Sequence, residues 1–280
     1  MSTREVEDLL SSIASTEVAA RTVNKARQLV CAIFNYGMRP STYGLATNPA
    51  HHADRRREPD AAPLAFYSPE QIEALARALA DGAHRDPSRP ALSPAEITAR
   101  ACEDAQDAEL ILLAAYAGLR RGELVALRWR DVDFVGRKLI VRRALSAETE
   151  LRSTKSRRAR EVPLPHQAAT ALERIGCRGE FTGPDDYVFA NRFGRRLDPS
   201  ALRRRFERAR DAADLEPLRF HDLRHTYGSL LVAGGIDLPT VKAAMGHSRL
   251  STTERYLHAR PAGERAERFT RALGGIAVPA

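Results

Sequence analysis

Two residues in the string HDLRH could hold a phosphate group. His221 and Arg224 are three positions apart at the expected start of a helix, so they share one helical face. An imidazole and a guanidinium beside a helix N-terminus both donate hydrogen bonds where the backbone already favours an anion. The string therefore indicates a phosphate-binding site.

Tyr256 lies where a nucleophilic side chain could be held in place. Gly246 ends an expected helix over residues 238–245, and Ser251 with Glu254 predicts a capping box that starts the next helix. We therefore expect Tyr256 in the second turn of a short, anchored helix. His247 lies nine positions ahead of Tyr256, just before this helix.

Further cations lie upstream. Arg120 and Arg121 follow Gly118 at an expected junction between two helices, with Glu123 close behind. Lys155 lies at an expected hairpin, and it stands out because almost all of the 44 Lys and Arg residues are arginine.

The order of these residues resembles that of the tyrosine recombinases, or phage integrases. The strings AGLRRGELVALRW, TKS, HDLRHT and GHSRLSTTERY are similar to those of the family, and the resemblance covers roughly residues 16–275. It implies a site-specific DNA recombinase or integrase with six catalytic residues: Arg120, Lys155, His221, Arg224, His247 and Tyr256.

The resemblance also implies how the phosphate is handled. Tyr256 would attack the scissile phosphodiester, giving a 3′-phosphotyrosyl bond and a free 5′-hydroxyl. Rejoining would need no ATP, because the new bond keeps the energy of the old one. Arg120 and Arg224 would clamp the non-bridging oxygens, and His247 would donate a further hydrogen bond.

Proton transfer falls to two other residues by the same resemblance. Lys155 would protonate the leaving 5′-oxygen, and His221 would act as general base toward Tyr256 or assist the clamp. Glu123 matches an acidic position that orders the site. No metal and no cofactor is implied, because the guanidinium groups supply the positive charge.

Several of these positions have alternatives. Tyr227 is the rival nucleophile, although its place in an apolar run favours a core role. Arg121 competes with Arg120 for the clamp, and the family pattern GLR-x-x-E-L selects Arg120. His247 could instead cap a helix, and Lys155 could be an ordinary surface lysine.

The string HDLRH also imitates the zinc-binding pattern HExxH. Asp222 is shorter than the required glutamate, and Arg224 would place a cation beside the metal, so a metal-dependent hydrolase is the weaker reading. His225 is then expected to be a buried, hydrogen-bonded structural residue. The three cysteines are far apart in the sequence and predict neither a disulfide framework nor a cysteine-based zinc site.

The overall charge favours a polyanionic partner. The formal net charge is +8 and the pI is about 9.8, which indicates nucleic acid, here double-stranded DNA. Arg157, Arg158 and Arg160 are expected to touch the DNA backbone. Residues 55–57 are either a solvated run of arginines or a further backbone contact. The chain has no apolar run that could span a membrane and no signal peptide pattern at residues 1–10, so we expect a cytoplasmic protein.

The hydrophobic pattern predicts a mainly α-helical chain with a small antiparallel β-sheet, an α+β fold. Helices are expected within residues 3–38 (two helices), 69–80, 94–116 and 122–128, and again after residue 166. Strands are expected over residues 138–145, 150–155 and 160–162, with a hairpin around residues 156–159.

These elements form three expected parts. Residues 1–47 are a partial helical core-binding domain that contacts DNA, residues 48–66 are a linker, and residues 67–280 are the catalytic domain. A tail helix could dock on a neighbouring protomer, since recombinases work as homo-tetramers on paired sites, with possible accessory excision or bending factors. Its apolar face consists of Ala262, Ala266, Phe269 and Leu273.

The amino-terminal part departs from the family. Only about two helices precede the linker, whereas the family usually has a four-helix core-binding domain. The alternative function is therefore a truncated DNA-binding remnant that does not recombine. The motifs do not separate integration or excision of a mobile element from the resolution of chromosome dimers.

Overall fold

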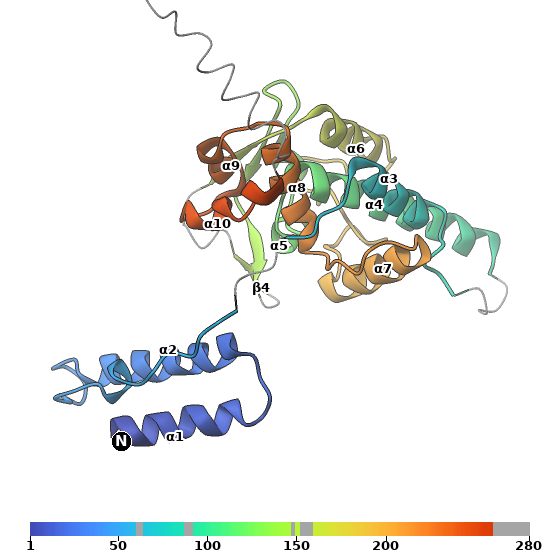
Figure 1. Cartoon of the computed structure of the whole chain (residues 1–280). Helices are drawn as coiled ribbons and strands as arrows, with labels where there is room; N and C mark the ends of the chain where they lie inside the picture. The colour runs from blue at the N-terminus through green and yellow to red at the C-terminus, as the bar shows by residue number, and fades with distance from the viewer. Residues whose placement is uncertain (60–63, 87–91, 147–148, 152–158, 260–280) are drawn as a thin grey trace, which may run out of the picture. The chain divides into compact units, whose positions relative to one another are not determined.

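The protein consists of two compact units. The computed structural model describes residues 1–59, 64–86, 92–146, 149–151 and 159–259. The smaller unit is Met1–Ala62 and the larger unit is Pro63–Ala280 (Figure 1). The expected fold class is confirmed, because the described residues are mainly helical with small antiparallel sheets. None of the helices described is both long and apolar enough to cross a bilayer.

The smaller unit is built on a pair of helices, as expected. Helix α1 (Thr3–Ala14) lies beside helix α2 (Ala20–Gly37) (Figure 1). Val6 and Leu10 of α1 are buried against Val23 of α2. These residues recur at helical spacing, so their burial is what turns two amphipathic segments into a folded unit.

The segment expected to be a linker begins as a folded part of the smaller unit. The 3-10 helix η1 (Pro49–His51) packs on α1 and α2, and Ala50 and Ala53 are buried. The side-chain amide of Asn24 both donates to and accepts from the backbone of Arg56, at 2.9 Å in each case. Composition rich in proline and charge did not predict this packing, in which two buried asparagines, Asn24 and Asn48, bind the segment to the helices.

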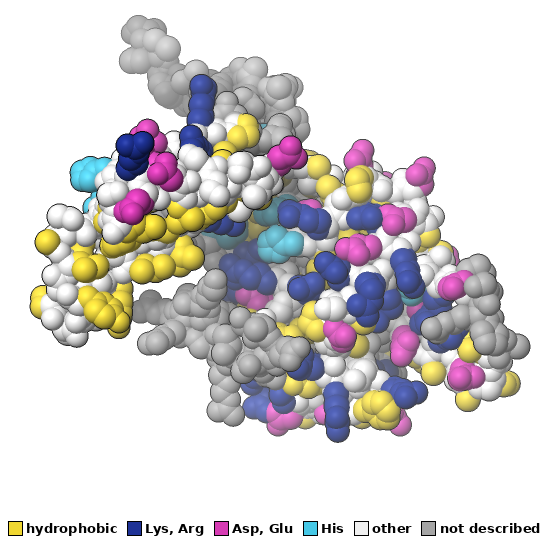
Figure 2. All heavy atoms as spheres, turned by 90° about the horizontal axis from the view of Figure 1, so that it is seen from below, with side chains coloured by type: hydrophobic (Ala, Val, Ile, Leu, Met, Phe, Trp, Pro, Cys, Tyr) yellow, Lys and Arg dark blue, Asp and Glu magenta, His cyan; other side chains and the backbone are white. Residues whose placement is uncertain are grey.

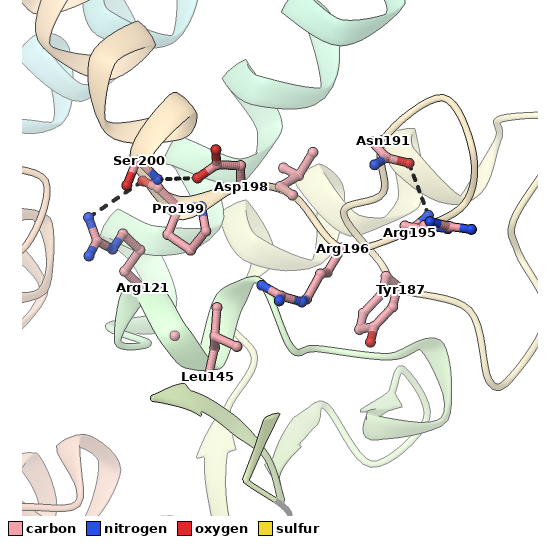
Figure 3. A pocket seen from close by; sticks show the side chains of 11 residues that line it. Arg121, Leu145, Tyr187, Asn191, Arg195, Arg196, Asp198, Pro199 and Ser200 are labelled. Atoms are coloured by element: carbon pink, nitrogen blue, oxygen red, sulfur yellow. Dashed lines mark hydrogen bonds between the residues drawn. The ribbon is translucent and has the colours of Figure 1, made fainter. Parts of the chain in front are cut away.

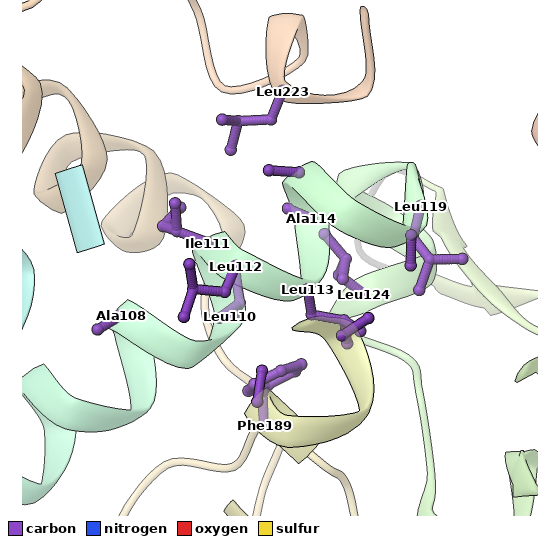
Figure 4. Close-up of a cluster of buried hydrophobic side chains, with 14 of the residues drawn as sticks. Ala108, Leu110, Ile111, Leu112, Leu113, Ala114, Leu119, Leu124, Phe189 and Leu223 are labelled. Atoms are coloured by element: carbon purple, nitrogen blue, oxygen red, sulfur yellow. The ribbon is translucent and has the colours of Figure 1, made fainter. Parts of the chain in front are cut away.

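Helix α4 (Pro94–Ala117) is the centre of the larger unit. Its last two turns, residues 110–117, are apolar on every side, so they must be covered on every side. It contacts α3 (Pro69–Ala80), α6 (His166–Gly176) and α8 (Asp222–Ala233). Figure 4 shows the resulting core, which includes Leu110, Ile111, Leu112, Leu113, Leu124, Phe189 and Leu223.

The remaining helices of the larger unit pack around this centre. Helix α7 (Pro199–Ala212) contacts α3, and α9 (Leu238–Met245) contacts α8. The one-turn helix α10 (Ser251–Glu254) contacts α9, and the 3-10 helix η3 (Leu257–Ala259) contacts α8. This last group carries Tyr256 between α10 and η3.

A three-stranded antiparallel sheet covers one side of the helical core. Its order is β1 (Val132–Asp133), β2 (Lys138–Val141) and β5 (Arg160–Pro163). Leu139 pairs with Val162, and both side chains are buried in the core. The sheet therefore fixes the position of Arg160 at the start of β5.

The strand expected over residues 138–145 is interrupted. After β2 the chain continues as β3 (Ala144–Ser146), which pairs with β4 (Thr149–Leu151) in a separate sheet. Arg143, in the gap between the strands, donates to the buried carboxylate of Asp131 at 2.6 Å. This ion pair redirects the chain, and the apolar pattern of the segment does not reveal it.

The helix expected over residues 122–128 is also shorter than predicted. Helix α5 (Arg121–Leu124) has a single turn. The carbonyl of Leu127 then accepts a hydrogen bond from the N–H of Val188, at 3.0 Å. Pairing with this distant segment ends the helix.

A buried ion pair joins α4 to α7 and gives a test of the fold. Asp107 is 1% exposed and accepts two hydrogen bonds from Arg205. Removing the guanidinium leaves an unpaired buried carboxylate, so Arg205→Ala should lower the free energy of unfolding by about 3 kcal/mol. Arg203→Ala, at an exposed position of the same helix, should change it by less than about 0.5 kcal/mol.

Urea unfolding measures both variants through the fluorescence of Trp129, the single tryptophan, which lies in the larger unit. Equal losses in the two variants would contradict the importance of the buried pair.

Candidate active site

Glu123 holds two guanidinium groups together. It is 2% exposed, and its carboxylate accepts hydrogen bonds from Arg120 at 2.9 Å and from both terminal nitrogens of Arg160 at 2.7 Å. It also accepts the backbone N–H of Arg120, at 2.8 Å. Because Glu123 is the third residue of α5, this one turn of helix itself positions Arg120.

This arrangement keeps Glu123 ionised. Burial raises the pKa of a carboxyl, but the hydrogen bonds and charge of Arg160, with those of Arg120, outweigh burial and hold the pKa of Glu123 at about 2. The prediction that Arg160 faces the DNA backbone is therefore wrong. Its side chain turns inward, because a buried carboxylate requires a partner of opposite charge.

Arg224 brings a third guanidinium to the same place. It is 3% exposed on α8, and it donates to the carbonyls of Gly118 and Met245. Both carbonyls lie at helix C-termini, where the backbone dipoles favour a cation. Among the described residues no carboxylate pairs with Arg224. Burial, followed by the charge of Arg120, lowers the pKa of Arg224 to about 10, so it stays charged at neutral pH.

Two glycines let the backbone approach these guanidinium groups. Gly118 ends α4 with φ 60° and Gly246 ends α9 with φ 62°, both left-handed. A Cβ at Gly118 would overlap the ring of Tyr227, and one at Gly246 would lie 2.7 Å from Cδ of Arg160. The carbonyl of Gly246 accepts a hydrogen bond from Arg120 at 3.4 Å.

The segment that carries Tyr256 differs from the expectation. Leu250, the residue before α10, already has helical backbone with φ −64° and ψ −37°, and no side chain caps the helix. A capping side chain needs extended backbone, so the predicted capping box of Ser251 and Glu254 is absent. Tyr256 lies in the turn after α10 rather than in its second turn, where its N–H donates to the carbonyl of Thr253 at 3.0 Å.

His247 is positioned by that same threonine. Its Nδ1 lies 3.0 Å from the hydroxyl of Thr253, which is fully buried. Burial lowers the pKa of His247 to about 4, and the charges of Arg224 and Arg120 add to the effect. The ring is therefore neutral at neutral pH. When Nδ1 accepts the threonine proton, Nε2 carries a hydrogen that can be donated to an anion.

Tyr256 is 1% exposed, and its ring packs against α8. A Cβ at Gly228 would come within 2.8 Å of its Cζ, so the ring rests directly on the helix backbone. Its hydroxyl oxygen, Oη, lies 2.8 Å from Nδ1 of His225. Burial raises the pKa of Tyr256 to about 12, despite the nearby charge of Arg224. The phenol of Tyr256 is therefore neutral at neutral pH.

Of the two histidines of HDLRH, His225 is the one that contacts Tyr256. His225, expected to be structural, is half-buried and reaches Tyr256, whereas His221 is exposed at the start of α8. Their rings lie edge to face with centroids 5.2 Å apart. Because 31 positions separate His225 from Tyr256, sequence spacing could not show this contact.

The rival residues lie elsewhere. Tyr227 is 6% exposed with its ring against Gly118, and burial raises its pKa. Arg121 reaches the carbonyl of Pro199 at 3.5 Å, while Arg120 takes the carboxylate of Glu123. Tyr227 is therefore a core residue. Arg120, rather than Arg121, forms a cluster of guanidinium groups with Arg160 and Arg224.

Some expected residues lie outside the described part of the chain. These are Lys155, Arg157, Arg158, most of the predicted hairpin and the tail helix. Within the residues that the structure does describe, no cluster of three or more His, Cys, Asp or Glu side chains could hold a metal ion.

A basic groove leads to the cluster. A pocket of about 500 Å³ is lined by Arg120, Arg121, Gly122, Glu123, Ala144, Leu145, Arg203, Glu207, Arg219, Phe220 and His221. A second pocket of about 780 Å³ adjoins it through Arg121, Gly122 and Leu145. Figure 3 shows Arg121 and Ser200 on one side of this second pocket, with Arg196 and Tyr187 on the other.

Basic side chains gather on one face of the molecule. Figure 2 shows Lys and Arg side chains around histidine side chains on this face, with some Asp and Glu side chains among them. Clustered positive charge in a groove attracts a polyanion and concentrates it at the site.

The buried carboxylate predicts a pH dependence of stability. The ordinary pKa of a glutamate is 4.5, while that of Glu123 is held at about 2. Its stabilising contribution is present above pH 4.5 and is lost as the pH falls from 4.5 toward 2. Wild type should be more stable than Glu123→Gln by roughly 3 kcal/mol at neutral pH, and this difference should shrink over that interval.

Urea unfolding of both proteins from about pH 7 to about pH 3 measures the difference, with Glu207→Gln, whose side chain is 40% exposed, as control. A difference that stays constant as the pH falls would contradict the assigned ion pairs.

The chain is similar to known recombinases in sequence. Residues 91–262 match the Phage integrase family. A "Tyrosine recombinase XerC-like" protein of Caldanaerobacter subterraneus subsp. tengcongensis is 30% identical over 177 residues, 54% of this chain and 45% of that protein. A "Tyrosine recombinase XerC" of Rhizobium meliloti is 32% identical over 196 residues, 69% of this chain and 57% of that protein. The chain thus spans about half the length of these relatives.

Solved structures show the same fold. The Tn1549 transposon integrase (residues 82–397), in complex with circular intermediate DNA, has a TM-score of 0.72 at 18% identity, over 97% of this chain and 86% of that one. A lambda integrase (75–356) dimer bound to a COC′ core site has a TM-score of 0.63 at 17% identity, over 94% of this chain and 81% of that one. Because the family match covers more than half of the sequence, this chain belongs to the phage integrase family of tyrosine recombinases.

Proposed function

We propose that this protein is a site-specific recombinase that cleaves and rejoins double-stranded DNA through a 3′-phosphotyrosyl intermediate. The observation that carries the proposal is an excess of positive charge beside a buried tyrosine. Within the described part of the chain, Arg120 and Arg160 share one carboxylate, that of Glu123. Arg224 is close enough to feel the charge of Arg120 but bonds to carbonyls. Desolvated charge of one sign is costly, so the cluster is suited to receive an anion such as a phosphodiester.

The free donors of the cluster define where the phosphate would bind. A guanidinium has five N–H groups, and Arg224 uses two of them on backbone carbonyls. The others, with those of Arg120 and the Nε2 hydrogen of His247, can bind the non-bridging oxygens. Donors fixed in advance stabilise the charge that builds up in the transition state, and each such donor contributes about a 100- to 1,000-fold rate increase.

Tyr256 is the proposed nucleophile, because its side chain lies against the helix that carries Arg224. Lys155 is proposed to protonate the leaving 5′-oxygen, and His221, at the edge of the pocket with Arg120, to assist the clamp. Glu123 acts by positioning Arg120 and Arg160.

The sequence relatives and the basic pockets support the assignment of the whole chain as a DNA recombinase. The relatives are recombinases by name, and the basic pockets offer a path for the DNA backbone. We assign the smaller unit to a partial core-binding domain, the larger unit to catalysis, and the chain to a cytoplasmic homo-tetramer assembled on paired sites. Its biological task is integration or excision of a mobile element, with accessory excision or bending factors.

Covalent trapping tests the proposal. A duplex that carries the cognate site and a nick beside the scissile phosphate should trap wild-type protein on DNA, because the short cleaved strand diffuses away. Tyr256→Phe should give no adduct, and Tyr227→Phe should give an adduct at the wild-type level if it folds. Denaturing gel electrophoresis measures the yield.

Salt-dependent binding of wild type to the same duplex without any adduct would instead support a DNA-binding remnant. An adduct that forms only with added metal, and is abolished by chelator, would favour a metal-dependent mechanism.

A further inference from the structure

We propose that His225 takes the proton of Tyr256 during strand cleavage and returns it during rejoining. This inference rests on the proposed function, and it gives the step to a residue other than His221. Both histidines are candidates for the general base, because His221 and His225 lie one turn apart at the start of α8.

The contact is direct. Oη of Tyr256 lies 2.8 Å from Nδ1 of His225, and among the residues that the structure describes no other side chain forms a hydrogen bond with this oxygen. A general base must lie within this distance of the proton that it removes. His221 is exposed and contacts the ring of His225 rather than the phenol.

The helix backbone sets this geometry. Gly228 follows His225 by three positions, so both lie on the same face of α8. A side chain at position 228 would push the ring of Tyr256 away, since its Cβ would lie 2.8 Å from Cζ and 2.9 Å from Cε2. The absence of a side chain here is what brings the phenol down to the level of His225.

Both groups start in the protonation state that the transfer requires, although the order of their resting pKa values opposes it. Burial, followed by the charge of His221, lowers the pKa of His225 to about 4, and burial raises that of Tyr256 to about 12. At neutral pH the imidazole is therefore neutral, and its Nδ1 lone pair can accept the phenol proton. A phosphodiester beside Arg224 brings negative charge, which raises the pKa of His225. The imidazole then becomes a stronger base at the stage when Tyr256 must lose its proton.

The step balances without a further reactant. A lone pair of Oη forms the bond to phosphorus as the O–H bond breaks and its proton passes to Nδ1. The bond between phosphorus and the 5′-oxygen breaks, and the leaving oxygen takes a proton from the acid assigned to Lys155. In rejoining, the 5′-hydroxyl attacks phosphorus and the imidazolium returns its proton to the departing phenolate.

Substitution of His225 separates proton uptake from positioning. His225→Ala removes both, whereas the side-chain oxygen of His225→Asn can accept the same hydrogen bond but cannot take the proton. Both variants should cleave the nicked duplex about 100- to 10,000-fold more slowly than wild type in single turnover. His166→Asn, at an exposed position on α6, should cleave at the wild-type rate. Circular dichroism melts establish that each variant is folded.

A second substrate identifies which oxygen His225 serves. A duplex with sulfur in place of the bridging 5′-oxygen has a leaving group that needs no protonation. The loss in His225→Asn should persist on this substrate, whereas the loss in Lys155→Ala should largely disappear. Rescue of His225→Asn by sulfur, a wild-type rate in His225→Asn, or a larger and sulfur-insensitive loss in His221→Asn would each overturn the inference.

The contact itself can be tested without cleavage. Nitrogen-15 NMR of the histidine rings should show the Nδ1 resonance of His225 shifting in Tyr256→Phe, and an unchanged resonance would overturn the contact. Failure of wild type to form any adduct would instead overturn the proposed function, so the two failures are distinguishable.

Discussion

The pairing of two arginines with one buried carboxylate is the interaction on which the site depends. Glu123 fixes Arg120 and Arg160, and so joins the end of α4, the single turn of α5 and the start of β5. The one negative charge of Glu123 does not balance the three guanidinium groups of the cluster. Arg224 is also buried, and the partners described for it are backbone carbonyls. Folding thus maintains a desolvated positive charge, at a cost in stability, where a phosphate can use it.

Burial sets the protonation state of the neutral groups, and the positive charge adds to its effect at His247. Burial and the arginines together lower the pKa of His247 to about 4, so the ring donates one hydrogen bond rather than adding a further charge. The phenol of Tyr256 stays protonated because it is buried. His247 and Tyr256 are therefore both neutral in the free protein. A bound anion would change the electrostatic potential at both side chains.

Close backbone approach completes the arrangement. Gly118 and Gly246 bring helix ends against Arg224 and Arg120, and Gly228 brings α8 against Tyr256. A side chain at these positions would overlap Tyr227, Arg160 and Tyr256, respectively. The site is thus assembled from glycines at helix ends and surfaces as much as from its charged residues.

The sequence predicted the mainly helical fold, the ends of the long helices and the membership of most of the cluster. Those inferences depend on local patterns, such as a glycine after an apolar run or a motif that keeps its order. It did not predict the inward turn of Arg160, the contact of His225 with Tyr256 or the break after β2, since each depends on a partner distant in sequence. The capping box at Ser251 was wrong because Leu250 is already helical.

If the buried guanidinium of Arg224 acts by offsetting phosphate charge, a neutral substrate should remove most of its effect. In a methylphosphonate, one non-bridging oxygen of the scissile phosphate is replaced by an uncharged methyl group. Single-turnover cleavage by Arg224→Ala should fall at least about 100-fold on the ordinary phosphodiester, and far less on the methylphosphonate, when each rate is compared with that of wild type. An equal loss on both substrates would show that Arg224 serves only the fold, and would contradict the account.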